Sequence, residues 1–186
     1  MEFISDRVST DRADGKFSVV IGARISGGQM AMLWAWLLAW LLCGAYFFSE
    51  LLRTPQGDFK VTLIVMLAFW AYFAFRAART VFWRAKGFEL WKLDNGELTV
   101  KNSLWGYGKA SRYFVGNIQR FGLLNMEETS WKWQMSDSFW TRGAERIGFE
   151  YNGKKVAIGR GLTKPEAEKL AHIMAQELRK VRKVGA

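Results

Sequence analysis

The chain has 186 residues, one cysteine and a formal net charge of +10, and 50% of its residues are hydrophobic although its mean hydropathy is only -0.06. This length leaves room for one soluble domain of about 100 residues plus a membrane element. The single Cys43 excludes a disulfide within the chain, and the low mean hydropathy indicates that the apolar residues are concentrated in a few segments.

The first 29 residues are polar, and their four basic and four acidic side chains balance one another. The apolar run that follows begins too late for a secretory signal and continues into a second run, so we expect no cleavage. Phe17–Ile25 is rich in β-branched residues, which predicts a short strand that ends at a break formed by Gly27 and Gly28. We therefore expect residues 1–29 to be a cytoplasmic N-terminal segment.

Two apolar segments follow, joined by a short polar turn. Met30–Phe48 holds no charged residue, and Val61–Phe75 is uncharged as well. A helix needs about 20 apolar residues to cross the hydrocarbon layer of a bilayer. The pattern predicts a transmembrane helical hairpin over residues 30–82, with spans at about 30–49 and 59–82. The alternative is a pair of helices in a soluble bundle.

Small side chains recur on both predicted spans at steps of three and four residues, which places them along one face of each helix. Such faces let helix backbones approach closely in a bilayer, where the hydrophobic effect does not drive helix association. One hypothesis is that the two faces pack on each other within the hairpin, and the other is that one face docks a partner helix. The candidate helix-packing residues are Ala31, Ala35, Ala39, Cys43, Ala71, Ala74 and Ala78.

The distribution of charge predicts the topology. The turn between the spans has two bases and two acids, whereas the segment 76–86 has four bases and no acid. Positively charged segments stay in the cytoplasm, so we expect both termini inside and only the turn outside. Residues 76–186 hold 21 Lys and Arg residues against 11 Asp and Glu residues, which accounts for the whole net charge.

The region 87–186 is predicted to contain short strands followed by one helix. Asn95-Gly96 and Asn152-Gly153 are each flanked by two apolar-rich runs, the strongest short signal for a β-hairpin. We predict about seven short strands in a small sandwich or barrel, with a strand at Trp131–Gln134 and a further candidate at Phe139–Thr141. The expected strands are Phe88–Leu93, Glu97–Lys101, Ala110–Val115, Ile118–Leu124, Trp131–Gln134, Arg146–Tyr151 and Lys154–Ile158.

The last segment is predicted to be an amphipathic helix. Thr163 and Glu166 have the spacing of a capping box, in which the two residues satisfy each other's backbone N–H groups. Apolar residues from Ala167 to Val181 follow at helical spacing. The expected fold is therefore an α+β membrane protein, in which a transmembrane hairpin is followed by a β domain capped by this helix.

Seven antiparallel strands closed by a C-terminal helix follow the order of a pleckstrin-homology (PH) fold. The chain also resembles, over residues 17–182, a bacterial family of small membrane proteins with two spans and a PH-like domain of unknown function. The residues that carry the resemblance, besides the strand before the first span, are Gly87-Phe88-Glu89, Leu98-Thr99-Val100, Tyr113-Phe114, Ile118, Gly148-Phe149, Tyr151, Gly159, Gly161-Leu162 and Glu166-Ala167.

The resemblance implies a bacterial plasma (inner) membrane location, a PH-like fold and no particular activity. PH domains that bind phosphoinositides have a basic cluster in the first strand loop, whereas the corresponding loop here, Asp94–Glu97, is acidic. Recognition of that kind is therefore not expected.

The sequence predicts no catalysis and no cofactor. His172 is the only histidine, so one chain cannot assemble a histidine metal cluster or a Ser-His-Asp triad. We expect His172 to lie at the surface or boundary of the last helix. The Gly159-Arg160-Gly161 stretch is interpreted as a turn, because it does not connect a strand to a helix as phosphate-binding loops do.

Two functional hypotheses remain. The first is an accessory subunit or scaffold of a membrane protein complex, with a membrane protein or a second copy of the chain as the partner. The second is a module that responds to anionic lipid; nucleic acid is not expected as a partner. Aromatic residues in the loop Glu127–Arg142 either contact a protein partner, cover the open end of the barrel or face the bilayer; they are Trp131, Trp133, Phe139 and Trp140. The candidate lipid-headgroup residues, which positive-inside topology alone would also explain, are Arg76, Arg79, Arg84, Lys86, Arg179, Lys180, Arg182 and Lys183.

Overall fold

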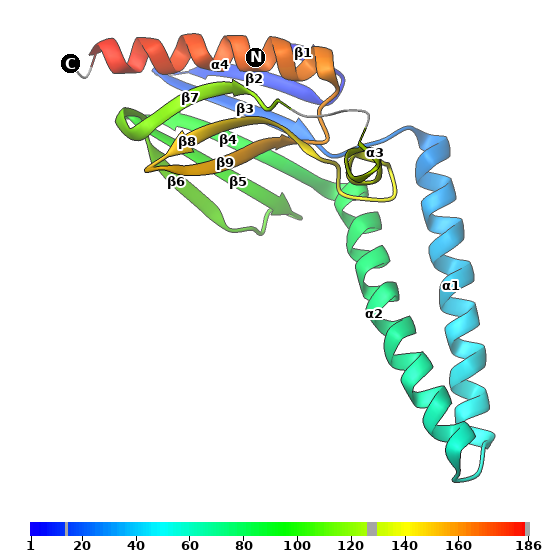
Figure 1. Ribbon diagram of the computed structural model, residues 1–186. Coiled ribbons are helices and arrows are strands. Elements are labelled where there is room, and N and C mark those ends of the chain that lie inside the picture. The colour runs from blue at the N-terminus through cyan, green and yellow to red at the C-terminus, as the bar shows by residue number, and fades with distance from the viewer. Residues whose placement is uncertain (14, 126–129, 185–186) are drawn as a thin grey trace. The chain divides into compact units, whose positions relative to one another are not determined.

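The computed structural model describes residues 1–13, 15–125 and 130–184 and has an α+β fold (Figure 1). It divides into two compact units: unit 1 comprises Met1–Arg24 and Lys86–Ala186, and unit 2 comprises Ile25–Ala85. The segment that forms unit 2 is therefore inserted within unit 1, between its third and fourth strands.

Six strands of unit 1 form one antiparallel sheet in chain order: β1 (Glu2–Ser5), β2 (Val8–Ala13), β3 (Lys16–Gly22), β4 (Gly87–Asp94), β5 (Glu97–Leu104) and β6 (Ala110–Phe114). Strand β3 pairs with β4 from Phe17 opposite Leu93 to Gly22 opposite Phe88. The strand predicted just before the first apolar helix is thus confirmed, and it pairs with the region that follows the second one.

A second sheet has three antiparallel strands: β7 (Ile118–Leu123), β8 (Glu145–Tyr151) and β9 (Lys154–Arg160), with a short 3-10 helix, η1 (Val115–Asn117), before β7. Both predicted Asn-Gly hairpins are confirmed. Asn95 and Asn152 have φ angles of 47° and 49°, the left-handed conformation that this two-residue turn requires.

Helix α4 (Lys164–Val184) closes the hydrophobic core between the two sheets. The Glu166 carboxylate accepts a hydrogen bond of 2.7 Å from the Thr163 N–H, as the capping box predicts. The predicted apolar face is buried at Leu170 and Met174, which belong to the same hydrophobic core as Trp91 of β4. Helix α4 is therefore the amphipathic helix that the sequence predicts.

The strands of unit 1 run between two ends. At one end β3 finishes and β4 begins, and the Ala23 N–H donates to the Gly87 carbonyl at 3.0 Å. Leu104, the last residue of β5, pairs with Gly87, so the β5–β6 turn lies at this end as well. We call this end the connector pole. The distal pole is the opposite end, where both Asn-Gly turns lie.

The N-terminus of α4 also lies at the connector pole. Glu166 in its first turn pairs with Arg7, whose carbonyl oxygen accepts a hydrogen bond from the Gly22 N–H at the end of β3. The C-terminal end of α4 lies at the distal pole, because Arg182 donates to carbonyl oxygens of Val115 and Ile118. Figure 1 shows this end of α4 pointing away from α3.

Unit 2 is an antiparallel pair formed by α1 (Gly27–Arg53) and α2 (Asp58–Lys86). Both helices are long and apolar enough to cross a membrane. The pair of glycines expected to break the chain instead begins α1, because Ser26 caps the helix and its hydroxyl accepts the Gln29 N–H at 3.4 Å. Each helix extends beyond the apolar segment that predicts it.

Two expectations about the strands are wrong. The N-terminal segment contains β1 and β2 in addition to the predicted strand. Trp131–Gln134 is not a strand but part of helix α3 (Trp131–Asp137), and Phe139–Thr141 is not a strand either. Because neither segment pairs with a neighbouring strand, a helix is the conformation in which the backbone groups of 131–137 can bond to each other.

Candidate functional site

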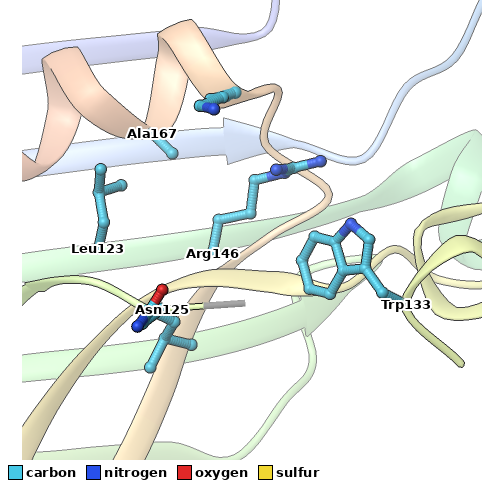
Figure 2. A pocket seen from close by; sticks show the side chains of 7 residues that line it. Leu123, Asn125, Trp133, Arg146 and Ala167 are labelled. Atoms are coloured by element: carbon cyan, nitrogen blue, oxygen red, sulfur yellow. The ribbon is translucent and has the colours of Figure 1, made fainter. Parts of the chain in front are cut away.

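A cavity of about 510 Å³ lies at the connector pole of unit 1, between the end of β7, the start of β8 and the first turn of α4 (Figure 2). Its walls are partly apolar, with Leu123 and Ala167, and partly polar, with Asn125, Arg146 and Lys164. Trp133 of α3 completes the lining. Among the described residues, the cavity therefore offers basic and aromatic side chains, and its named lining has no carboxylate, hydroxyl or thiol group.

Arg146 holds α3 against the second sheet. Its guanidinium lies 4.8 Å from the centre of the Trp133 ring and forms a 2.7 Å ion pair with Asp137 at the end of α3. Trp133 is only 8% exposed as a result. This contact explains why the segment 131–137 packs as a helix, and it gives Trp133 a structural role within unit 1.

A buried carboxylate joins the two sheets near the same pole. Glu89 of β4 is 2% exposed. Its Oε1 accepts the indole N–H of Trp91 at 2.7 Å and the Gly159 N–H at 3.0 Å, and its Oε2 accepts the Arg160 N–H at 2.9 Å. Gly159 can present its N–H in this way because its φ of 76° suits glycine. The prediction of a turn at 159–161 is therefore wrong for Gly159 and Arg160, which belong to β9, where their N–H groups bind a carboxylate of the same chain.

The two helices of unit 2 are joined by reciprocal hydrogen bonds. The Trp70 indole N–H donates to the Trp40 carbonyl at 2.9 Å, and the Trp40 indole N–H donates to the Trp70 carbonyl at 3.4 Å. A Cβ atom on Gly44 would lie 2.0 Å from the Trp70 ring, so only glycine leaves room for the indole. Ala74 occupies the equivalent position, four residues after Trp70, and is buried.

Only some of the small residues predicted to form packing faces are buried between α1 and α2. On α2, Ala74 is buried and Ala78 half-buried, but Ala71 is exposed. On α1 the buried positions are Leu33, Leu37 and Gly44. The four candidate residues of α1 are all exposed, namely Ala31, Ala35, Ala39 and Cys43. The hypothesis that the two small faces pack on each other is therefore wrong for α1.

The candidate lipid-headgroup residues fall into different environments. Arg76, Arg79 and Lys86 are exposed on α2, whereas Arg84 is 4% exposed. On α4, Lys180 forms an ion pair with Glu177, and Arg182 is hydrogen-bonded at the distal pole. Arg179 and Lys183 are exposed on the same stretch of α4. The bases of α4 therefore lie at the end of unit 1 opposite the two connectors to unit 2.

The remaining candidate aromatic residues are more accessible than Trp133. Trp131 is 68% exposed and Trp140 41% exposed, and the Phe139 ring lies 4.8 Å from that of Trp140. The residues 127–129 of the predicted contact loop lie outside the described part of the chain. Sequence reasoning missed Trp105 and Tyr107 in the β5–β6 turn, which are 58% and 86% exposed.

Two ion pairs attach α4 to the N-terminal strands. Burial alone would raise the pKa of Glu166, but hydrogen bonds from Arg7, the Thr163 N–H and Ser5 outweigh it and lower this pKa from its ordinary value of 4.5 to about 2. Burial would likewise raise the pKa of Glu177, but Lys180 and Arg12 lower it. These contacts are structural links between the ends of the chain.

Within the described residues, no group of three or more His, Cys, Asp and Glu side chains could hold a metal ion. His172 is exposed on α4, where its ring is within hydrogen-bond distance of the Gln176 amide, as expected for a surface residue. Comparisons with protein-family models, with curated proteins and with solved structures found no match.

Proposed function

We propose that this chain is a non-catalytic integral membrane protein of the bacterial inner membrane, which acts as an accessory subunit or scaffold of a membrane protein complex. In this proposal α1 and α2 form a transmembrane hairpin, and unit 1 is a PH-like domain on the cytoplasmic side. The chain would hold its partner through the hairpin and this domain.

The observation that carries the proposal is the exposure of large apolar side chains around both helices of unit 2. Only a narrow seam between the helices is buried, and an exposed apolar surface of this extent is typical of contact with lipid or with another protein. The exposed residues include Trp34, Trp36, Leu38, Leu42, Phe48, Ile64, Val65, Phe69, Phe73 and Phe75.

The pairing of β3 with β4 supports a hairpin. Because only four residues lie between the end of β3 and the start of α1, and α2 leads directly into β4, two paired strands hold the outer ends of the helices. Both ends must then lie on the same side of any membrane that the helices cross. The excess of basic residues after α2 favours the cytoplasm for that side.

The number of strands supports a PH-like domain, although the seven strands are not the same seven that the sequence predicts. Strands β3 to β9 are seven antiparallel strands, and α4 follows the last of them. The expected set of seven began at Phe88 and included a strand at Trp131–Gln134. In the structure β3 is the first of the seven, and the segment Trp131–Gln134 is not a strand. On this assignment the transmembrane hairpin is inserted after the first strand of the domain, and β1 and β2 are an N-terminal extension of its sheet.

The exposed small side chains of α1 support a partner helix as the binding mode. Ala35 and Ala39 leave the backbone of α1 accessible, and the hairpin itself does not use them. A helix of a partner protein, or of a second copy, could therefore approach α1 closely. The alternative function, a module that responds to anionic lipid, has less support because the bases of α4 lie far from the connectors.

Cysteine labelling tests the topology. In a Cys43→Ala background, a cysteine at Gln56 in the turn between the helices should react with an impermeant maleimide added to intact spheroplasts. A cysteine at Lys154 in the β8–β9 turn should react only after lysis. Labelling of Gln56 only after lysis would contradict the proposed orientation.

Purification in mild detergent tests the scaffold. The full chain should co-purify with a membrane protein in fixed stoichiometry, or as a defined oligomer. Replacement of Ala35 and Ala39 by Leu should release the partner, whereas Leu38→Ala on a different face of the same helix should not. Recovery of a monomer alone would contradict the proposed role.

A further inference from the structure

We infer that exposed aromatic residues at the connector pole of unit 1 insert into the headgroup layer of the same bilayer that holds α1 and α2. These residues are Trp105, Tyr107, Trp131 and Trp140, and together with the exposed Met135 of α3 we call them the aromatic collar. The inference rests on the proposed transmembrane hairpin and adds a second point of attachment to it.

Four of the collar residues come from two separate elements at the same end of unit 1, and Trp140 follows the second of them. Trp105 and Tyr107 lie in the β5–β6 turn, beside the start of β4. Trp131 and Met135 lie on α3, which Arg146 at the start of β8 holds in place. The start of β8 pairs with Arg160, whose N–H donates to Glu89 of β4. Both elements are thus linked to the start of β4, where the chain enters unit 1 from α2.

The exposure of these side chains is high for their size. Tyr107 is 86% exposed, Trp131 68%, Met135 60% and Trp105 58%. Trp133, between Trp131 and Met135 in sequence, is buried, so α3 presents apolar side chains on its outer face as well as its inner one. Trp and Tyr prefer the interface of a membrane, where an apolar ring with one polar atom meets both lipid and water.

The β5–β6 turn carries a tryptophan at a cost in backbone conformation. Leu104 and Tyr107 exchange backbone hydrogen bonds of 2.8 and 3.0 Å, and the two residues between them, Trp105 and Gly106, have φ angles of 52° and 84°. The turns at Asn95-Gly96 and Asn152-Gly153 have Asn at the first central position, as the left-handed conformation favours. A bulky residue held in this unfavourable conformation suggests that its side chain has a functional role.

The length of the connectors brings the collar to the depth of the headgroups. Because Trp40 lies beside Trp70 in an antiparallel pair, the start of the apolar segment at Met30 is level with Thr80. From Thr80 to Lys86 the helix rises about 9 Å. The headgroup layer on each side of the hydrocarbon is about 5–8 Å deep. With no residue between α2 and β4, the connector pole cannot lie far outside this layer.

The charges near the collar suit an anionic bilayer surface. Arg24 and Lys86 at the two connectors and Lys109 after the β5–β6 turn are all exposed. Bases at this depth are attracted to anionic headgroups. Interfacial aromatic rings and nearby bases together favour a lipid surface as the occupant rather than a protein partner.

Spin labels in vesicles test the inference. The full chain with Cys43→Ala is reconstituted in phosphatidylcholine and phosphatidylglycerol, with one nitroxide at Lys109, Gln134, Leu38 or Lys154. Relaxation by oxygen and by a water-soluble nickel chelate reports the depth of each label. We expect Leu38 to be deeply immersed, Lys109 and Gln134 to be at headgroup depth, and Lys154 at the distal pole to be in water.

The possible results separate the two proposals. If Leu38 is immersed but Lys109 and Gln134 behave like Lys154, the hairpin stands and the collar inference is wrong, which leaves the collar as a surface for a protein. If Leu38 is exposed to the nickel chelate, the transmembrane hairpin itself is wrong.

A substitution in the turn gives an independent test. Trp105→Asn should raise the melting temperature by a few degrees, because Asn suits the turn, and should make Lys109 several-fold more accessible to the nickel chelate. Phe114→Asn removes an exposed aromatic ring at the distal pole and should leave the accessibility of Lys109 unchanged. Loss of stability in Trp105→Asn, without a change at Lys109, would mean that Trp105 has only a structural role.

Discussion

The indole rings of Trp40 and Trp70 each donate a hydrogen bond to the backbone carbonyl of the other residue, across the interface between α1 and α2. Each carbonyl is also the acceptor for the N–H four residues later in its own helix, at Gly44 and Ala74. Those small residues leave each carbonyl accessible to a second donor. The contact is therefore nearly symmetric, and it fixes the register of the two helices.

Gly44→Ala tests this interface. The new Cβ would lie 2.0 Å from the Trp70 ring, so the ring must move and both hydrogen bonds must lengthen. We expect a loss of about 1–3 kcal/mol in the free energy of unfolding, measured by titration with sodium dodecyl sulfate from a mild detergent. Gly28→Ala is the matched control, because nothing lies within 4 Å of its Cβ. Equal stability of the two variants would contradict the described packing.

Glu89→Gln tests the buried link between the two sheets. The carboxylate accepts three N–H donors, and an amide in its place turns its own N–H₂ group toward at least one of them. A buried donor left without an acceptor costs about 1–3 kcal/mol. Chemical denaturation of the full chain in detergent should show a loss of this size. Glu97→Gln, which removes the same charge from β5, should have little effect.

Acid should weaken the attachment of α4 to the N-terminal strands. The pKa of Glu166 is lower in the folded chain, about 2, than its ordinary value of 4.5. The carboxylate therefore stabilises the fold above the ordinary value, by at most about 3 kcal/mol. That contribution is lost as the pH falls from about 5 to about 2.

Stability measured from pH 7 to pH 2 should thus fall less steeply in Glu166→Gln than in the unaltered chain. The exposed Glu168 on the same helix provides the control, and Glu168→Gln should keep the steep dependence. Identical pH profiles for all three proteins would mean that the ion pair with Arg7 does not form.

Unit 1 should fold without the hairpin. Ala23 and Gly87 are joined by a backbone hydrogen bond, so an Asn-Gly turn in place of Arg24–Lys86 would connect β3 to β4 as a two-residue hairpin. We expect a soluble protein with cooperative thermal unfolding and a near-ultraviolet circular dichroism signal from the buried Trp91. A chain of residues 87–186 alone should lack both properties, because it has lost β3 and with it Val19 and Ile21 of the core. Cooperative unfolding of 87–186 would contradict this.

The elements with a local signal could be predicted from the sequence. Asn95-Gly96 and Asn152-Gly153 specify two hairpins by their own conformational preference, and the spacing of apolar residues specifies α4. The two long helices follow from composition alone. Each of these signals lies within a short stretch of chain, which is why a single sequence is sufficient.

The elements that depend on distant contacts could not be predicted. The alternation of Trp131 and Trp133 favours a strand, but the stacking of Trp133 on Arg146 of β8 stabilises a helix instead. Strands β1 and β2 are polar, and Arg7 and Arg12 stabilise them by ion pairs with α4, more than 150 residues away. The sequence pattern of a short segment cannot indicate ion pairs with residues so far away along the chain.

The candidate site illustrates the same limit. Small residues at steps of four predicted an interface on Ala35 and Ala39, whereas the helices meet through Trp40, Gly44 and Trp70. The sequence also contains the pattern of the buried face of α1, because Leu33, Leu37, Trp40 and Gly44 recur at alternating steps of four and three residues. The identity of residues cannot reveal which of two such stripes faces the neighbouring helix, because both satisfy the same geometry.

The insertion of the hairpin between β3 and β4 affects the order of events during synthesis. Strand β3 leaves the ribosome before α1 and can pair with β2 at once, but its other neighbour in the sheet, β4, appears only after residues 23–86 have been made. Until then Val19 and Ile21 have no core to enter. In the proposed transmembrane topology, completion of the domain therefore requires the hairpin to return the chain to the side of the membrane from which α1 started. A chain whose hairpin is arrested halfway would display an unfinished sheet, which proteases and chaperones recognise.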